Sequence, residues 1–479
     1  IKTNRSLNIM EAEWFDHPEW WFGCSQEIDL YLGEKYECLL NAGQHDKLTS
    51  IDAIVLYDQL PRHIYRNQNA EHIITYFLQK ALAIAININY DKLDDDRLCF
   101  ALLPLRHSGV INNVYKALRI AWTRIKTTDS QILRRFLKAT YANCPLQAAS
   151  IAAPVSNFDR SILFFDPCDK PKHPYNFADL PTYMSKTIVL SISGGVDSMV
   201  CSWLICNKYP RDRCVAVHVN YNNRSTSDEE EKFVRHWCAF LGIKCYVRKI
   251  HEIQRHPCMQ HGLRNTYETY TRNVRYQCYK QFPESLILLG HNRDDILENI
   301  FTNIAQKKKY DNLDGMKAFS EQEGIEFWRP MLHRTKVDIC AFAHEFNIPY
   351  LPTSTPAWSK RGQIRGSVVP VLRRWDHDFT ESLHELSSVV RDLYQMNDAH
   401  VDQFFESMQK VDGKVIFSGK YTVVPVFWRE VFTRLCIHVS DKSMKHFIEC
   451  LKRNTQQAVM ICKSCKIHIK KNQIYLEYV

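Results

Sequence analysis

The stretch that most constrains this chain is residues 187–200, TIVLSISGGVDSMV. Residues 187–192 are mainly β-branched and aliphatic, which is typical of a buried parallel strand. The glycine turn SGGVDS follows, and then an apolar segment with helical character. This order of strand, glycine turn and helix points backbone N–H groups and a helix dipole at a phosphate. The stretch therefore predicts an anion-binding loop, with an ordinary strand-to-helix turn as the alternative.

The residues of this turn indicate how an anion would be held. The two glycines let the backbone approach closely, and the two serines add hydroxyl donors. An aspartate here would repel phosphate unless a cation lies between them, so Asp197 predicts Mg²⁺. SGGVDS resembles the pyrophosphate loop of the N-type ATP pyrophosphatases, and the chain has no GxxxxGK[ST] motif. The resemblance implies that ATP is bound by Ser193, Gly194, Gly195, Val196, Asp197 and Ser198.

Composition places the chain among globular proteins. Its 479 residues are enough for two or three domains, with 45% hydrophobic and 24% charged residues. No apolar run approaches the ~18 residues of a membrane span, so we expect a cytoplasmic protein without a membrane partner. The 17 cysteines have no framework spacing, which favours a reducing compartment, and Cys462 and Cys465 fit unpaired thiols in a hairpin better than zinc ligands. The net charge of +9 permits a polyanionic partner.

Residues 1–165 are predicted to be all-helical. Apolar side chains recur at helical spacing in three segments, residues 25–45, 47–88 and 112–140. The motifs WWFG, LYDQLPRHIYR and LPLRHS resemble an uncharacterised bacterial family with a tetratricopeptide-like build, over most of residues 14–145. We expect a scaffold or a substrate-docking module.

Polar residues in the second of these motifs allow two interpretations. Asp58 and Arg62 are four residues apart, so with Gln59 and Arg66 they would form either a polar site or a helix-end salt bridge with solvated arginines. His107 is interpreted as structural. Residues 166–184 hold four prolines without apolar periodicity, which is typical of a linker, so residues 1–165 are expected to be separable.

Residues 185–372 alternate strand and helix patterns. Further strands are expected at residues 214–219, 244–247 and 286–289, and a helix at residues 228–241 that ends at Gly242. This order predicts an α/β fold with a doubly wound parallel sheet, preceded by the all-α domain and followed by a small α+β tail.

Acidic residues follow the fourth strand of this sheet. The segment GHNRDDILE places His291, Asp294, Asp295 and Glu298 at the start of a helix. The carboxylates would either cap the helix or, at the same sheet edge as SGGVDS, hold Mg²⁺ or orient a base and an amine. We favour the functional interpretation.

Residues 264–280, RNTYETYTRNVRYQCYK, predict a basic helix rich in tyrosine. Glu268 and Arg272 are four residues apart and Arg275 follows three later, so one face carries a row of charges. Arginine beside stackable aromatic rings suits phosphates and exposed bases. A solvated amphipathic helix is the alternative.

An ordered set of motifs over residues 187–372 resembles tRNA(Ile)-lysidine synthase. The set comprises HVNYNNRSTSDEEEKFV, ETYTRNVRYQ, GHNRDDILENI, NLDGM, WRPMLHRTKVDICAFAHEFNIPYL and KRGQIRGSVVPVL. The resemblance implies ATP and Mg²⁺, with tRNA and free lysine as substrates. It implies that Asp197, Asp294, Asp295 and Glu298 are catalytic. It also implies nucleotide or tRNA contacts by Arg224, Glu268, Arg272, Arg275, His291, Arg329, Arg361 and Arg365.

Three positions depart from the family pattern. Tyr221 and Asn292 stand where the family usually has histidine, and residues 353–356 interrupt an Asp-x-Ser-Asn patch. The segment GHNRDDILE also resembles tRNA thiolases of the same superfamily, which generally need paired cysteines near the site. No CxxC pair occurs between Cys201 and Cys278, so lysidine formation is favoured over sulfur transfer.

Residues 373–479 are expected to form a substrate-binding tail. A helix is predicted over residues 380–408, another over residues 442–451, and a closing hairpin over residues 458–478. Lys463, Lys466, Lys470 and Lys471 would follow an RNA backbone or be solvated. The expected reaction transfers AMP to the C2 oxygen of a tRNA cytidine, after which lysine displaces AMP, and a homodimer is possible. The alternatives are a tRNA thiolase and a non-catalytic tRNA-binding or scaffold protein.

Overall fold

The computed structural model describes most of the chain in two compact units. Unit 1 comprises residues 1–289, 321–328 and 342–352, and unit 2 comprises residues 290–320, 329–341 and 353–479. The predicted linker (166–184) and the segment 353–356 lie outside the described residues. The described residues are 10–23, 25–41, 48–66, 68–155, 160–163, 186–305, 315–352, 360–411, 414–418, 422–453, 457–462, 465–470 and 473–478.

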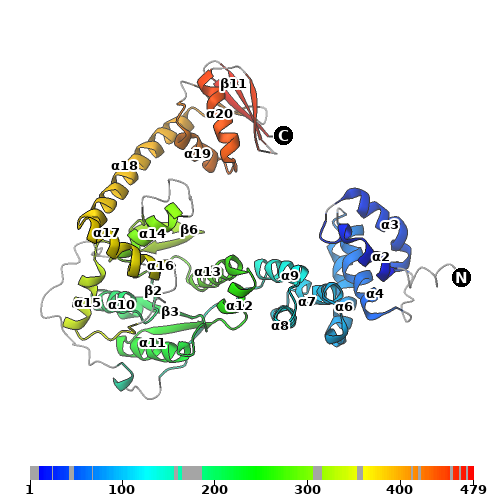
Figure 1. The fold of residues 1–479 in the computed structure, drawn as a ribbon, viewed down its shortest axis with the longest axis horizontal. Coiled ribbons are helices and arrows are strands. Elements are labelled where there is room, and N and C mark those ends of the chain that lie inside the picture. Colours follow the sequence, from blue (N-terminus) through cyan, green and yellow to red (C-terminus); the bar gives the residue numbers. More distant parts are fainter. Residues whose placement is uncertain are drawn as a thin grey trace. The chain divides into compact units, whose positions relative to one another are not determined.

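A mostly parallel sheet organises the second half of unit 1 (Figure 1). The strand order is β1-β4-β3-β2-β5-β7-β6, and β4, β3, β2, β5 and β7 run parallel. The short edge strand β1 pairs antiparallel with β4. The doubly wound α/β fold predicted from the sequence is confirmed. The strands are β1 (Ser150–Ile151), β2 (Ile188–Ser191), β3 (Cys214–Asn220), β4 (Lys244–Lys249), β5 (Leu286–Leu288), β6 (Phe319–Gln322) and β7 (Ile325–Trp328).

Helices that alternate with the strands along the chain pack against the sheet. Gly242, with φ of +70°, ends α11 as predicted, because a left-handed residue stops a helix and glycine adopts it without strain. Val189, Val217 and Ile287 face the core that α13 shares. Since side chains alternate along a strand, their neighbours face α10 and α11 on the other side. These helices are α10 (Val196–Lys208), α11 (Ser227–Leu241), α12 (Arg255–Gln260) and α13 (Arg264–Lys280).

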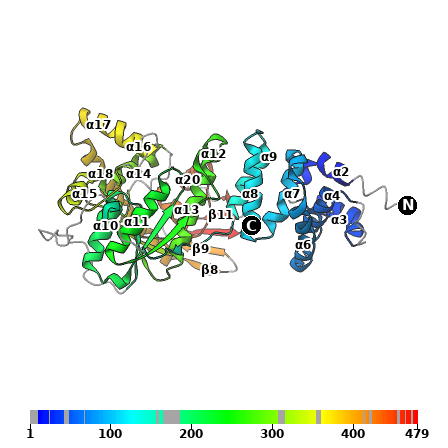
Figure 2. The same cartoon turned by 90° about the horizontal axis from the view of Figure 1, so that it is seen from below.

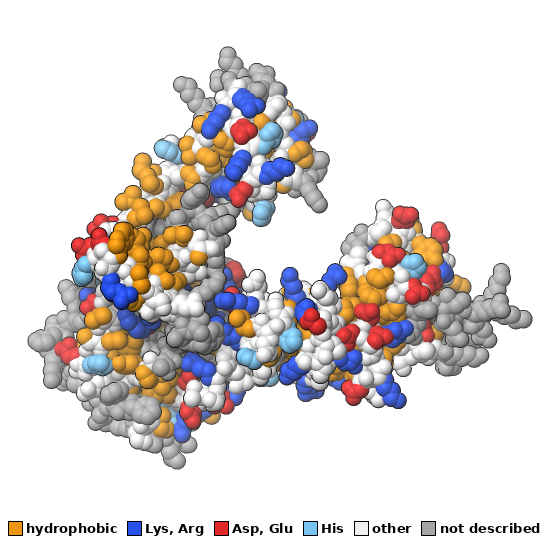
Figure 3. Space-filling model, viewed as in Figure 1, with side chains coloured by type: hydrophobic (Ala, Val, Ile, Leu, Met, Phe, Trp, Pro, Cys, Tyr) orange, Lys and Arg blue, Asp and Glu red, His pale blue; other side chains and the backbone are white. Residues whose placement is uncertain are grey.

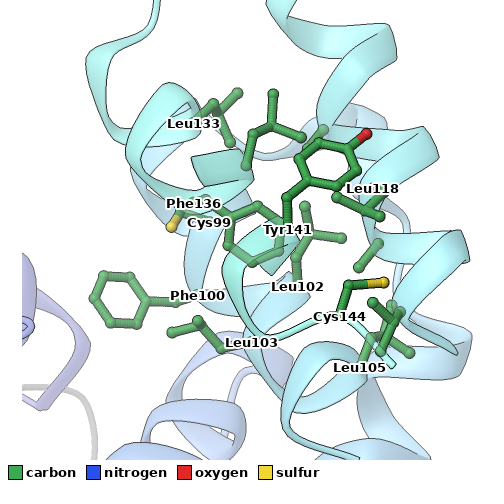
Figure 4. Close-up of a cluster of buried hydrophobic side chains, with 14 of the residues drawn as sticks. Cys99, Phe100, Leu102, Leu103, Leu105, Leu118, Leu133, Phe136, Tyr141 and Cys144 are labelled. Atoms are coloured by element: carbon green, nitrogen blue, oxygen red, sulfur yellow. The ribbon is translucent and has the colours of Figure 1, made fainter. Parts of the chain in front are cut away.

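The amino-terminal part of unit 1 is mainly helical, as predicted, but β1 at residues 150–151 pairs with the sheet, so residues 1–165 are not all-helical. Its helix α7 was missed because all residues from Leu98 to Leu105 are buried, so the segment shows no apolar periodicity. Figure 4 shows how side chains of α7, α8 and α9 form the local core. The helices are α2 (Met10–Asp16), α3 (Gln26–Asn41), α4 (Ser50–Ile54), the π-helix η2 (Val55–Gln59), α5 (Leu60–Ile64), α6 (Glu71–Asn87), α7 (Asp95–His107), α8 (Ile111–Ile125) and α9 (Gln131–Ala142).

The polar residues of the helical region form a buried network. Asp58 is 1% exposed and accepts hydrogen bonds from Gln59, from Arg62 at 3.4 Å and from His107 at 2.9 Å. Burial raises the pKa of this carboxyl, but His107 and Arg62 lower it by more than burial raises it. The net pKa is therefore below its usual value. The ion pair between Asp58 and Arg62 is therefore present, as the four-residue spacing predicted, but its carboxylate is buried in the core while Arg62 stays partly exposed.

The helical region and the sheet share one hydrophobic core. Tyr141 of α9 packs edge-on against Tyr270 of α13 at 5.1 Å between ring centroids, and its hydroxyl donates to the Glu252 carbonyl at 2.7 Å. A single cluster of buried side chains runs from Trp14 to Phe327. Figures 1 and 2 show α9 beside α12 and α13. We expected residues 1–165 to be separable, whereas the structure shows that they share a core with the sheet. The domain boundaries at residues 165, 184 and 372 stay predictions.

Deleting residues 1–165 is expected to destabilise the sheet. The truncated chain would lose β1 from the sheet edge and uncover the aromatic face around Tyr270, which removes apolar burial worth roughly 25 cal/mol per Å². We expect a chain that starts near Tyr183 to be less soluble, and to unfold at lower denaturant concentration, than the full chain. Equal solubility and an equal unfolding midpoint would contradict the shared core.

Unit 2 contains helices and a five-stranded antiparallel sheet of order β10-β11-β12-β9-β8. Trp428 and Phe447 are fully buried between the helices and this sheet. The small α+β tail and its closing hairpin are confirmed. The elements are α14 (Arg293–Ala305), α16 (Lys360–Gln363), η7 (Ile364–Val368), α17 (Val369–Trp375), α18 (Phe379–Glu406), α19 (Pro425–Arg434), α20 (Asp441–Arg453), β8 (Gln409–Val411), β9 (Lys414–Ser418), β10 (Ala458–Cys462), β11 (Cys465–Lys470) and β12 (Gln473–Tyr478). Helix α15 (Lys336–Glu345) follows β7.

Among the described helices, none combines the length and the apolar character that a membrane crossing requires.

Candidate ATP-binding loop and carboxylate cluster

The SGGVDS turn joins β2 to the first turn of α10. Gly194 has φ of +84°, a conformation that favours glycine, and its carbonyl accepts a hydrogen bond from the Leu351 amide at 2.9 Å. A Cβ atom at this position would lie 2.9 Å from Leu351 Cδ1. Gly195 is the N-cap of α10. The backbone path therefore requires glycine at position 194, whereas Gly195 has an ordinary extended conformation and leads directly into the helix.

The two serines of the loop have different positions. Ser198 is 8% exposed, and its hydroxyl donates to the Gly195 carbonyl at 2.9 Å and accepts from the Ser193 amide at 3.2 Å. Ser193 is exposed and accepts a long hydrogen bond from the Gly195 amide. Ser198 thus stabilises the loop from its buried side, whereas Ser193 lies on the side that faces solvent.

The first turn of α10 carries backbone donors that suit a phosphate. Its amides at Val196, Asp197 and Ser198 have no partner within the helix, because the first turn lacks preceding carbonyls. Together with the positive end of the helix dipole, they favour an anion. Asp197 is half-buried in the same turn. This arrangement fits a nucleotide phosphate, and a carboxylate in the same turn is of the residue type that binds the cation of such a phosphate.

Helix α13 runs from the turn after β3 to the end of β2. The hydroxyls of Tyr279 and Ser191 are 2.7 Å apart, and the Asn223 amide donates to the Tyr267 hydroxyl at 2.6 Å. These bonds fix α13 against the carboxyl edge of the sheet. They were not predicted, because the partners are 88 and 44 residues apart and no local pattern relates them.

Arg275 points into this part of unit 1. Burial lowers its pKa, but Tyr221, Tyr279 and Tyr276 raise it more, and Tyr221 is also its hydrogen-bond partner. The tyrosine that departs from the family pattern therefore contacts a predicted substrate residue.

The other predicted substrate residues of unit 1 are on the surface. Arg272 is half-exposed, lies over the Tyr276 ring at 4.8 Å and is 3.9 Å from Glu323. Glu268 pairs with Arg264 at 2.8 Å instead of with Arg272, so the predicted charge row is not continuous. Arg224, in the turn after β3, is 3.5 Å from Glu230.

In unit 2, Asp295 caps its own helix. Its carboxylate accepts from the Asn292 amide at 3.0 Å, and the Asn292 side chain accepts from the Asp295 amide at 3.1 Å. This reciprocal pair satisfies two donors at the start of α14. Asn292 is fully buried, so the second departure from the family pattern has a structural role.

Asp294 caps a different helix. Its carboxylate accepts from the Lys336 amide at 2.7 Å, at the start of α15. For Asp294 and Asp295, the capping interpretation that we placed second has direct support, and their predicted catalytic roles stay predictions.

Glu298 is buried, and two arginines lie beside its carboxylate. Its Oε1 accepts from Arg365 Nη2 at 2.6 Å, and its Oε2 lies 3.9 Å from Arg361 Nε. Oε2 is buried and accepts no hydrogen bond. Burial raises the pKa of this carboxyl more than Arg365 lowers it, so the net pKa is above its usual value. Glu298, Arg361 and Arg365 were all predicted as site residues, and they lie together.

Arg329 and His291 also lie together in unit 2. Arg329 Nε donates to His291 Nδ1 at 3.2 Å, and its guanidinium also binds the Lys317 carbonyl at 2.8 Å and the Ser320 hydroxyl at 2.9 Å. An arginine has no acceptor, so the Nδ1 of His291 must be unprotonated. Arg329 is 8% exposed and braces this turn.

Comparisons with known proteins agree with the sequence motifs. Residues 171–372 match the PP-loop domain family, and residues 10–159 match a family of bacterial proteins of unknown function. The tRNA(Ile)-lysidine synthase of Staphylococcus aureus strain COL is 26% identical over 236 residues, which are 47% of this chain and 53% of the relative. That of Mycoplasma genitalium is 30% identical over 187 residues, which are 38% of this chain and 60% of the relative.

The chain thus spans little more than half the length of the curated relatives that it matches. Among solved structures, a U34-tRNA thiolase from Methanococcus maripaludis aligns with a TM-score of 0.33 and 15% identity, over 43% of this chain and 72% of that one. The resemblance of the SGGVDS region to PP-loop enzymes and that of the helical region to an uncharacterised bacterial family are confirmed by these two family matches. The chain therefore carries a PP-loop domain, related to tRNA(Ile)-lysidine synthases, joined to a domain of an uncharacterised bacterial family.

Proposed function

We propose that this chain is an ATP-dependent tRNA-modifying enzyme that forms lysidine. The observation that carries the proposal is the SGGVDS loop, whose positive-φ glycine and first-turn amides fit a polyphosphate. The curated relatives, which are lysidine synthases, support the choice of reaction. ATP, tRNA and free lysine are the substrates of a cytoplasmic enzyme, and a homodimer stays a prediction.

In the first step, the C2 oxygen of a tRNA cytidine attacks the α-phosphorus of ATP. The bond between the α-phosphorus and the bridging oxygen breaks, and pyrophosphate leaves with that electron pair. The amides of Val196, Asp197 and Ser198 would bind the phosphate oxygens on which negative charge develops. Asp197 would hold Mg²⁺, which neutralises charge on the leaving group when it is bound.

In the second step, the amine of lysine attacks C2 of the adenylated base. The C2–O bond breaks, AMP leaves with the oxygen, and the amine loses a proton. We propose that Glu298 takes this proton, because its raised pKa brings a carboxylate closer to the basicity that proton transfer requires. Arg361 and Arg365 would keep its charged form accessible.

Mass analysis of nucleosides tests this reaction directly. After incubation of tRNA(Ile) with enzyme, ATP and lysine, a cytidine is expected to gain the mass of lysine minus water. The gain must disappear when either ATP or lysine is omitted. Sulfur incorporation in a thiolation mixture would instead identify a thiolase, and the absence of ATP–pyrophosphate exchange would identify a non-catalytic protein.

The cysteines of the PP-loop region favour lysine transfer over thiolation. Sulfur transfer needs accessible thiolates, but burial raises the pKa of Cys258 to about 12 and that of Cys278 to about 11. Each of the cysteines in the described part of this region up to Cys278 is buried.

Arg272 and Arg275 provide a matched pair for the tRNA contact. Half-exposed Arg272 fits a phosphate contact, so Arg272→Ala is expected to reduce the log–log salt slope of tRNA affinity by about one. Arg275 lies among tyrosines at the sheet edge, so Arg275→Ala is expected to slow pyrophosphate release and leave the slope unchanged. Wild-type slope and rate in both variants would leave α13 as a packing helix.

A further inference from the structure

A cavity of about 350 Å³ lies within unit 1, between helix α8 and the segment that follows β4. Helix α8 belongs to the region that matches the uncharacterised family, whereas β4 belongs to the PP-loop domain. The volume is within the range of ligand sites, roughly 300–1,000 Å³. The residues that the argument uses are Tyr115, Arg119, Trp122, Lys126, His251 and Glu252.

The cavity combines aromatic rings with exposed cations. The Tyr115 ring meets His251 edge-on at 5.9 Å, and Trp122 is half-buried in the wall. Arg119 and Lys126 are exposed at the rim. Unpaired RNA bases stack on aromatic rings while their phosphates bind arginine and lysine, so this lining is suited to a nucleotide.

The side chains of Glu252 and Trp122, in the wall of the cavity, have partners within the protein. Glu252 forms a buried ion pair with Arg248 and accepts from the Tyr270 hydroxyl at 2.9 Å. Trp122 Nε1 donates to the Tyr141 hydroxyl at 2.7 Å. Although burial raises the pKa of Glu252, Arg248 lowers it below its usual value, so the carboxylate stays ionised and paired. It does not repel a phosphate at the rim.

The charge of the helical region changes sign along the chain. Residues 10–107 hold sixteen acidic and eight basic residues, whereas residues 108–149 hold seven lysines and arginines and one acidic residue, Asp129. Figure 3 shows Lys and Arg side chains over α8 and α9. A polyanion is therefore attracted to the side of the helical region that adjoins the cavity and disfavoured elsewhere on it.

The cavity also lies at the functional edge of the sheet. It adjoins the carboxyl end of β4, and in the order β4-β3-β2 the phosphate loop follows the carboxyl end of β2. Two strand spacings separate these ends by roughly 10 Å across the sheet. We propose that the cavity binds an unpaired nucleotide of the RNA substrate, so that the helical region contributes to tRNA recognition. This inference rests on the proposed function.

Single substitutions at the rim test the phosphate contacts. We expect Arg119→Ala and Lys126→Ala each to weaken tRNA binding at low salt and to reduce the log–log salt slope by about one. Lys92→Ala removes one exposed charge from the acidic part of the helical region and is the matched control, with wild-type affinity and slope.

A substitution in the wall tests base stacking. Tyr115→Leu is expected to weaken tRNA binding by a factor between about 5 and about 160, since one stacked base contributes about 1–3 kcal/mol by alanine substitution. Tyr115→Phe keeps the ring and should bind as the wild type. Equal unfolding midpoints for both variants would exclude a folding defect.

The outcomes separate this inference from the proposed function. If the wild type forms lysidine and every variant binds tRNA with wild-type affinity and slope, the cavity is not an RNA site and the proposed function stands. If the wild type binds no tRNA, both proposals are wrong. Loss of binding in the rim variants and in Tyr115→Leu, but not in Lys92→Ala or Tyr115→Phe, would establish the nucleotide site.

Discussion

Replacing Asp197 with alanine is expected to abolish ATP-dependent pyrophosphate release while the protein stays folded. The carboxylate lies in the first turn of α10, after the phosphate loop, where it would bind the cation that neutralises the leaving group. Loss of its interaction with the helix dipole costs only about 0.3–1 kcal/mol of stability. Pyrophosphate release in the presence of tRNA and the unfolding midpoint measure the two effects separately.

Asp212→Ala is the matched control for this experiment. Asp212 is an exposed aspartate in the 3₁₀ helix η5 (Arg211–Arg213), which belongs to the same unit. Its removal should change neither rate nor stability. Unchanged pyrophosphate release in Asp197→Ala, at any Mg²⁺ concentration, would show that Asp197 is not the metal ligand.

Glu298→Gln is expected to stop lysine transfer and to leave pyrophosphate release intact. The substitution keeps the size of the side chain and one acceptor oxygen for Arg365 but removes the carboxylate that accepts the proton, and general bases contribute typically about 10²–10⁴-fold. In a single-turnover assay, pyrophosphate should appear at the wild-type rate while lysidine forms at least about a hundredfold more slowly. Equal losses in both steps would place Glu298 in binding or folding rather than in proton transfer.

The same variant is expected to change the pH dependence of stability. Because the pKa of Glu298 in the folded protein is above its ordinary value of 4.5, its ionisation opposes folding. The stability that protonated Glu298 contributes is fully present below pH 4.5 and is lost as the pH rises through the raised pKa. Glu298→Gln should lack this loss, whereas Glu385→Gln, at an exposed position in α18, should retain it. Parallel stability curves for all three proteins would contradict the raised pKa.

Local sequence patterns predicted the elements that carry the phosphate loop. The helix expected at residues 264–280 is observed as α13 with the same bounds, because its apolar face repeats at helical spacing and no glycine or proline interrupts it. The strand at β3 is one residue longer than expected. Gly194 has φ of +84°, which agrees with the glycine turn predicted there, while its predicted contact with ATP stays a prediction.

Contacts between distant segments were not predictable from one sequence. Glu298 and Arg365 were each named as site residues, but nothing local indicates that they form an ion pair across 67 positions. Asp295 was interpreted as a site residue, yet the pair that it forms with Asn292 is a capping pair, which uses the same residue types. Strand β7 was missed although Gly324 precedes it and Pro330 follows it, because four residues are too few to show a clear alternating pattern.

The core shared by the helical region and the sheet has a consequence for biosynthesis. The helices up to Tyr141 leave the ribosome before α13, whose Tyr270 covers them, has been made. At roughly 5 to 20 residues per second, synthesis of the stretch from Ile151 to Leu289 takes about 7 to 28 s. During this interval the aromatic face of α9 is exposed to water and to neighbouring nascent chains. Variants that weaken the contact between Tyr141 and Tyr270 should therefore lower the yield of soluble protein in the cell more than they lower the stability of the protein once it has folded.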